Sequence, residues 1–138
     1  MSAKWVLLAD PKDYGWPELQ RDGRAVWDGI RNSRAQSNLR RMTDGDLALL
    51  YHTAPDKAIT GIVRITGAPR PDPADESRVV VDVEPVQPLA QPLPLSDLKA
   101  DEVLAGIGFV RMPRVAVWPV EDAQWRRVLE VSGTRLRR

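Results

Sequence analysis

One short segment of the chain gathers side chains that could hold a nucleotide. Residues 24–41 contain one indole (Trp27), three amides (Asn32, Gln36 and Asn38) and five arginines (Arg24, Arg31, Arg34, Arg40 and Arg41). An indole face can stack on a base, and an amide carries both a donor and an acceptor that can read a base edge. An arginine fork suits phosphate. Together these side chains are what a pocket for one extruded nucleotide would need.

The same residues have ordinary structural explanations. A tryptophan such as Trp27 is more often a core anchor than a stacking platform, and Asn32 is well placed to cap a helix. The helix arginines are more often a solvated face than a phosphate site. Tyr51 and His52 could simply end a strand with their polar tips exposed. Residue chemistry alone therefore leaves both the binding and the structural interpretation open.

Motifs of catalysis and of metal binding are missing from the chain. There is no glycine-rich phosphate loop, no H-E-x-x-H helix and no G-x-S-x-G turn around a serine. The chain has one histidine, His52, and no cysteine, so it cannot supply a zinc tetrad of histidine and cysteine. Asp28 with His52 is the only acid–base pair that we could nominate. We expect a protein that is not an enzyme and that uses no cofactor and no metal.

Bulk properties predict a single small domain. The 138 residues carry a net charge of +1, so a nucleic-acid partner would be held by a local patch. We expect one domain at residues 1–133 and a basic, frayed tail at 134–138. The absence of cysteine fits a reducing cytoplasm. No signal peptide is evident, and no apolar run approaches the roughly 20 residues of a membrane-spanning helix, so we predict a cytoplasmic location without a membrane partner.

The pattern of apolar residues, prolines and glycines predicts an α+β fold. Helices are expected at 33–42 and 121–131, short helical segments at 14–20, 95–98 and 102–105, and strands at 4–9, 25–27, 47–52, 58–66, 78–88 and 115–117. Exposed or stiff connections are expected at 67–77, 88–94 and 109–113. Gly61 is predicted to mark a bulge or a close approach. These elements favour a small, curved, largely antiparallel sheet or barrel with helices around it.

Several stretches in a fixed order resemble a known family. They are Tyr14-Gly15-Trp16-Pro17-Glu18-Leu19, Trp27-Asp28-Gly29-Ile30-Arg31-Asn32, Gly45-Asp46-Leu47 continuing to His52, Leu95-Ser96-Asp97-Leu98-Lys99, and the late positions Arg111 and Arg114. Through these residues the sequence resembles the EVE domain family of the PUA-like superfamily, over roughly residues 4–131. The resemblance implies a PUA-like β pseudobarrel with short flanking helices.

The same resemblance implies a function and a set of site residues. It implies non-catalytic binding of a modified base in DNA or RNA through one pocket. The implied ligand-binding residues are Trp27, Asp28, Gly29, Arg31, Asn32, Asn38, Tyr51, His52, Arg111 and Arg114. Trp27 would stack on the base, Asn32 or a nearby backbone group would read its edge, and Arg31, Arg111 and Arg114 would hold phosphate. Two alternatives remain: an enzyme acting on a nucleobase or nucleotide, and an adaptor for a small molecule or a protein that uses the same fold.

The chain departs from the family pattern beside the expected pocket. Relatives usually have Lys-Ser-Glu-Pro after the first strand, whereas this chain has Leu8-Ala9-Asp10-Pro11. Leu8 and Ala9 would make that wall drier, so the ligand could differ from that of the relatives. Trp118 stands where the family usually has a polar residue, and we expect it to pack locally.

Overall fold

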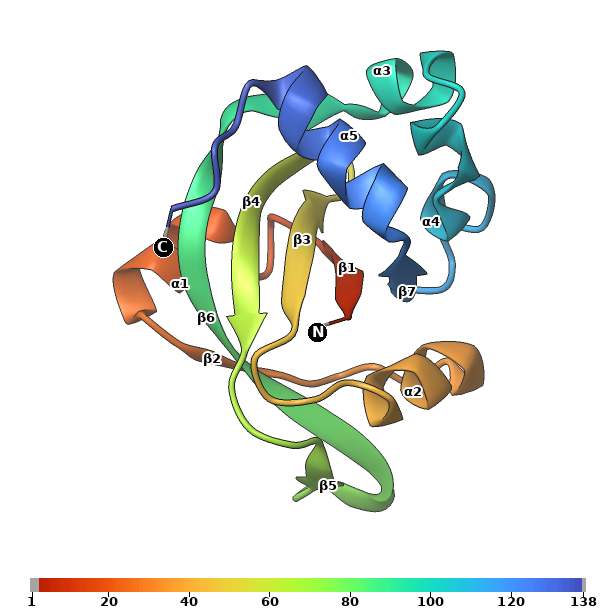
Figure 1. The fold of residues 1–138 in the computed structure, drawn as a ribbon. Helices are drawn as coiled ribbons and strands as arrows, with labels where there is room; N and C mark the ends of the chain where they lie inside the picture. Colours follow the sequence, from red (N-terminus) through yellow and green to blue (C-terminus); the bar gives the residue numbers. More distant parts are fainter. Residues whose placement is uncertain (1–2, 138) are drawn as a thin grey trace.

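The centre of the protein is one strongly curled mixed sheet (Figure 1). The computed structural model describes residues 3–137, so Met1 and Ser2 of the expected domain and Arg138 of the expected tail lie outside the described residues. The elements are β1 (Lys4–Ala9), α1 (Trp16–Asp22), β2 (Ala25–Trp27), α2 (Ser33–Arg40), β3 (Leu47–His52), β4 (Ala58–Ile65), β5 (Arg70–Asp72), β6 (Asp75–Pro94), α3 (Leu95–Ala100), a 3₁₀ turn (Leu104–Gly106), α4 (Gly108–Arg111), β7 (Val117–Val120) and α5 (Asp122–Ser132). The strand order is β2-β6-β4-β3-β1-β7, and β5 pairs with β6. This is the α+β fold that was predicted, with a curled sheet and short helices around it.

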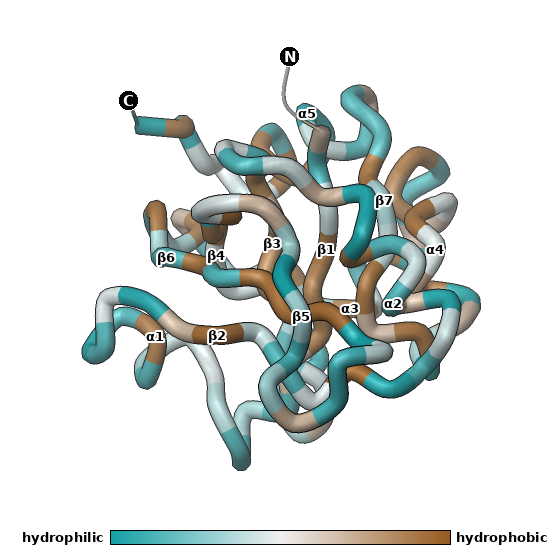
Figure 2. Tube along the Cα trace, turned by 90° about the horizontal axis from the view of Figure 1, so that it is seen from below, coloured by the Kyte–Doolittle hydropathy of each residue, from teal (hydrophilic) through white to brown (hydrophobic). Residues whose placement is uncertain are grey.

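Two neighbouring strands, β1 and β3, explain where the core lies. β1 and β3 are nearly continuous apolar runs, and such runs form strands that are covered on both faces. They pair in parallel, with Leu7 opposite Leu50 and Ala9 opposite His52, whereas the other strand pairs are antiparallel. Figure 2 shows the hydrophobic residues of β1 and β2 beside mostly hydrophilic connections. The parallel pairing brings the carboxyl ends of β1 and β3 to the same edge.

Two longer helices flank the last strand, with α5 above and α2 below β7 in Figure 1. Asn32 caps α2, because its side-chain oxygen accepts a hydrogen bond from the Ala35 N–H at 2.9 Å. Trp125 and Val128 form the buried face of α5. Both helices were predicted within one or two residues of their bounds. No helix within residues 3–137 is long and apolar enough to cross a membrane.

Some connections predicted from proline content are regular structure instead. The expected loop at 67–77 contains β5 and the start of β6, and the expected connector at 88–94 is the second half of the same 20-residue β6. The pairing of β4 with β6 shifts register between Ile59 and Gly61 and between Ile62 and Val63. Prolines are tolerated at such irregular positions, where the regular ladder of hydrogen bonds is interrupted. The expected loop at 109–113 begins as α4, and the strand expected at 115–117 is β7, two to three residues later.

The C-terminal residues lie against β6. Thr134 accepts a hydrogen bond from the Ala90 N–H through its Oγ1, at 2.9 Å. Gln87 donates to the Arg135 carbonyl at 3.0 Å and accepts from the Arg137 N–H at 2.7 Å. The sequence predicted a frayed end, whereas residues 134–137 are held by these bonds because a buried glutamine side chain satisfies the backbone on both sides.

Gly61 makes the close approach that its position in a strand predicted. A Cβ built on Gly61 would lie 2.5 Å from ring atoms of the buried Trp16, and Gly61 also sits at a register shift. We expect Gly61→Ala to lower the free energy of unfolding by about 2 kcal/mol, because a well-packed core cannot absorb the added methyl group. Urea denaturation measures the change. Gly106→Ala is the control, since its Cβ would meet only the end of Gln124 at 3.3 Å, and an equal loss in both variants would contradict the explanation.

Candidate nucleobase pocket

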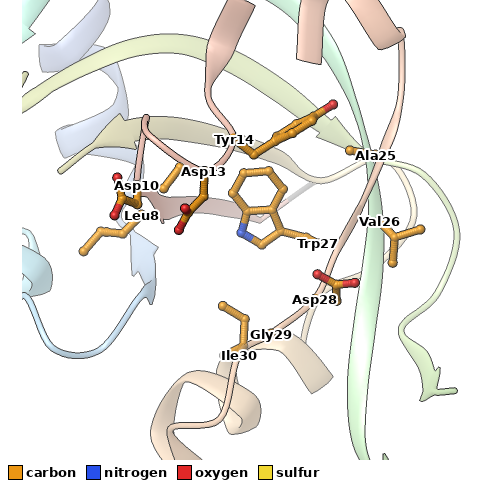
Figure 3. Close-up of a pocket in the computed structure, with 11 residues that line it drawn as sticks. Leu8, Asp10, Asp13, Tyr14, Ala25, Val26, Trp27, Asp28, Gly29 and Ile30 are labelled. Carbon is orange, nitrogen blue, oxygen red and sulfur yellow. The ribbon is translucent and has the colours of Figure 1, made fainter. Parts of the chain in front are cut away.

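A cavity of about 500 Å³ opens beside the carboxyl end of β1 (Figure 3). Its lining residues come from two segments. The first, at the end of β1 and after it, contributes Leu8, Ala9, Asp10, Asp13 and Tyr14, and the second, along and after β2, contributes Ala25, Val26, Trp27, Asp28, Gly29 and Ile30. The first segment turns back on itself because the Asp10 carbonyl accepts hydrogen bonds from the N–H groups of Asp13 and Tyr14. The second bends away from the sheet at Gly29, whose φ of 75° is a conformation that favours glycine.

Two aromatic rings form the inner wall of the cavity. Trp27 is only 8% exposed, and Tyr14 meets it edge-on with ring centroids 6.4 Å apart and planes at 75°. The Tyr14 hydroxyl donates to Asp22 at 2.8 Å. Burial and this bond to Asp22 raise the pKa of Tyr14 to about 12, so the phenol is neutral at physiological pH. The rings are thus a fixed apolar surface rather than a source of charge.

The indole nitrogen of Trp27 is a donor without a partner. Figure 3 shows it on the side of the ring that faces Leu8 and Asp13. No hydrogen bond to Trp27 Nε1 is present within residues 3–137. Although the Trp27 side chain is buried, its Nε1 is not enclosed by protein atoms, so this donor is available to a ligand in the cavity.

The charged lining of the cavity is entirely acidic. Asp10, Asp13 and Asp28 are its charged members, and within the described part of the chain no lysine or arginine lines it. Asp10 accepts a hydrogen bond from the Lys12 N–H at 2.9 Å, which ties it to the turn. Nowhere in residues 3–137 do three histidine or acidic side chains gather closely enough to hold a metal ion. The carboxylates are therefore spread around the rim, where they can act as hydrogen-bond acceptors.

The structure brings only part of the predicted site together. Trp27, Asp28 and Gly29 line the cavity, and Arg31 and Asn32 follow on the same loop without lining it. The side-chain oxygen of Asn32 is already used in the cap of α2. The segment from Trp27 to Asn32 thus lines the cavity with its first residues and caps α2 with its last.

Asn38, Tyr51 and His52 are buried away from the cavity. Asn38 donates to the Val117 carbonyl at 2.7 Å and so joins α2 to β7. Tyr51 packs against Phe109 with ring centroids 4.6 Å apart. The prediction that Tyr51 and His52 expose their polar tips is wrong, since each is 4% exposed.

His52 has a structural contact at each ring nitrogen. Its Nε2 accepts a hydrogen bond from the Trp16 N–H at 3.0 Å, and its Nδ1 lies 2.9 Å from Asp56. Because Nε2 accepts, the proton is on Nδ1 and is donated to Asp56. His52 therefore anchors the start of α1 to the end of β3, and neither nitrogen is directed to the cavity.

Arg111 and Arg114 are exposed on the segment that leads into β7. That segment adjoins the cavity wall, because the Leu8 N–H donates to the Ala116 carbonyl at 2.9 Å. Neither arginine lines the cavity.

The arginines of α2 and Trp118 serve packing. The Arg34 guanidinium lies 4.5 Å from the Trp118 ring centroid, and Arg41 lies 5.6 Å from that of Trp5. Arg40 donates to the Ser77 carbonyl at 2.7 Å. Trp118 is buried against Gly108, as its expected local packing requires.

Sequence reasoning about site residues missed Asp13, Tyr14, Ala25, Val26 and Ile30. Leu8, Ala9 and Asp10 were expected beside the pocket, from the departure after the first strand, and they do line it. Asp13 and Tyr14 directly follow that departure, so nearness along the chain was the available signal. Contact between this turn and β2 depends on strand order, which spacing in the sequence does not reveal.

The fold and cavity can now be compared with known proteins. Rpa0253 from Rhodopseudomonas palustris, an NMR structure, is 32% identical, covers 95% of this chain and 93% of its own, and has a TM-score of 0.90. Human THYN1, crystallised in complex with DNA containing 5-methylcytosine, is 20% identical, with 97% and 99% covered and a TM-score of 0.86. An ASCH protein from Zymomonas mobilis is 13% identical, with 94% and 95% covered and a TM-score of 0.56. A search of the curated proteins found no match.

These comparisons assign the protein first to a fold class and then to a family. The curled half-barrel with short helices is PUA-like, as its likeness to the ASCH structure shows. The EVE domain model matches residues 3–131, which is nearly the whole chain. The chain belongs to the EVE domain family, as the resemblance in its motifs indicated.

Proposed function

We propose that this domain binds a modified nucleobase of DNA or RNA in the cavity beside Trp27, without catalysing a reaction. The observation that carries the proposal is the cavity itself, which joins a buried indole, a free indole N–H and acceptor carboxylates. Ligand pockets combine such an apolar wall with a few convergent polar groups. The complex of human THYN1 with DNA containing 5-methylcytosine supports a base as the occupant.

The lining residues suggest how a base would be held. Trp27 would stack on the base or support its edge, and Leu8 and Ile30 would contact an added methyl group. Burying one methyl group contributes about 0.8 kcal/mol, which favours a methylated base over its unmodified counterpart. Arg31, Arg111 and Arg114 would contact the phosphates outside the cavity.

Binding is tested with labelled single-stranded and double-stranded oligonucleotides, as DNA and as RNA, that carry one modified cytosine or adenine. We expect saturable binding that is about fourfold tighter for the best methylated base than for the unmodified base. Fluorescence anisotropy at fixed salt concentration gives the dissociation constants, since phosphate contacts depend on salt. Absence of saturable binding to every oligonucleotide would overturn the proposal.

The two alternatives make different demands on the cavity. An enzyme would need an acid and a base facing one another, and the nominated partner of Asp28, His52, is buried and engaged at both ring nitrogens. An adaptor for a small molecule would bind free nucleosides or other compounds as tightly as it binds an oligonucleotide. Calorimetric titration with free nucleosides separates that case from nucleic-acid binding.

A further inference from the structure

The acidic residues that line the cavity restrict the chemical class of the ligand more than the aromatic residues do. Asp13 and Asp28 make no side-chain hydrogen bond or ion pair within residues 3–137, and neither side chain stabilises its own loop. Both belong to the same cavity as the unpartnered N–H of the buried Trp27 side chain. The cavity thus offers one donor at its wall and several acceptors at its rim, with negative charge that no lining cation balances.

We infer that the preferred ligand is a base whose ring carries a positive charge and an exocyclic amino group, as a base methylated on a ring nitrogen does. This inference rests on the proposed function, and it names the class of base. 3-Methylcytosine is an example: methylation at N3 leaves a cationic ring at neutral pH, with an amino group at C4 and a carbonyl oxygen at C2. The Trp27 N–H would donate to the carbonyl oxygen, and the carboxylates would accept from the amino group.

Three physical contributions favour the cation over a neutral isomer. A cationic ring is attracted to the negative face of an aromatic ring such as Trp27 or Tyr14, and the attraction is greatest where the pair is desolvated. Asp10, Asp13 and Asp28 attract the positive charge, although their exposure weakens each attraction. A hydrogen bond from a charged donor to a carboxylate is stronger than a neutral one. A neutral methylated base makes the apolar contact and hydrogen bonds from uncharged donors, without these three contributions.

A pair of isomers isolates the charge from the methyl group. Single-stranded oligonucleotides of one sequence carry cytosine, 5-methylcytosine or 3-methylcytosine at one position. The last two have the same non-hydrogen atoms, and the cationic 3-methylcytosine carries one additional proton. We expect 3-methylcytosine to bind roughly tenfold more tightly than 5-methylcytosine. We expect the double variant Asp13→Asn, Asp28→Asn to reduce this preference to threefold or less, because the variant loses more affinity for the cationic base than for 5-methylcytosine.

A double variant elsewhere controls for net charge. Asp97→Asn with Asp44→Asn removes two negative charges from residues that do not line the cavity, and it should leave the preference unchanged. Equal affinities for the two isomers in the wild-type protein would overturn the inference and leave the proposed function standing. If Asp13→Asn, Asp28→Asn kept the full preference for 3-methylcytosine over 5-methylcytosine, the inference would also be overturned, because these carboxylates would then not be the groups that recognise the charge. Failure to bind any of the three oligonucleotides would count against the proposed function itself.

Discussion

Replacing Trp27 with leucine is expected to weaken binding of a modified oligonucleotide by at least tenfold. Trp27 forms the inner wall of the cavity and presents both a ring and a free N–H to it. Loss of a stacking aromatic costs about 1–3 kcal/mol per base, which is roughly 5- to 150-fold in affinity. Fluorescence anisotropy with the tightest-binding oligonucleotide measures the change.

The matched variant separates stacking from folding, because Trp27 also belongs to the core. Trp27→Phe keeps an aromatic face and an apolar volume, so we expect a loss of about threefold only. Thermal denaturation establishes the temperature below which each variant is folded, and binding is compared there. If a folded Trp27→Leu protein bound as tightly as the wild type, the ring would not contact the base.

Replacing Asp46 with alanine is expected to cause the largest loss of stability, about 3 kcal/mol. This carboxylate is 1% exposed and accepts four hydrogen bonds, from the Ala3 N–H, the Trp5 indole, and the Thr43 N–H and hydroxyl, at 2.9–3.1 Å. Removing it leaves several buried donors without a partner. Differential scanning calorimetry should show a fall in Tm of roughly 10 °C.

The stabilisation by Asp46 should depend on pH in a defined direction. Burial raises the pKa of Asp46, but the hydrogen bonds from Thr43, Trp5 and Ala3 outweigh burial and hold the pKa below its ordinary value. A carboxyl group with a lowered pKa in the folded state contributes its stability above the unfolded pKa, about 4, and loses it as the pH falls further. The stability difference between wild type and Asp46→Ala should therefore be constant from pH 7 to 5 and shrink below pH 4.

Asp44→Ala is the control for this second prediction. Asp44 lies two residues away, is exposed and accepts one hydrogen bond, from the Gly67 N–H at 2.8 Å. We expect a loss of about 0.5–1 kcal/mol, because water replaces an exposed partner. Similar losses for Asp44→Ala and Asp46→Ala would show that the buried network at Asp46 does not anchor β1 to the turn before β3.

Local features of the sequence were sufficient to predict the family, the curled α+β fold and Trp27 as a residue of the candidate pocket. The cap of α2 at Asn32, the buried strands β1 and β3, and the close approach at Gly61 follow from residue types that act over a few positions. Trp27 was identified because its neighbours Asp28 and Gly29 form a specific motif with it. Such properties depend on side-chain chemistry and on spacing along the chain, both of which the sequence displays directly.

Only the tertiary structure decided which polar residues share the cavity. Parallel pairing of β1 with β3 sets Ala9 beside His52 and engages His52 with Trp16 and Asp56, so it is not free for a ligand. The curling of the sheet brings the turn after β1 to β2, so that Asp13 and Tyr14 share the cavity with Trp27, which lies 13 positions beyond Tyr14 in the chain. These contacts depend on long-range strand order, which no pattern of neighbouring residues specifies.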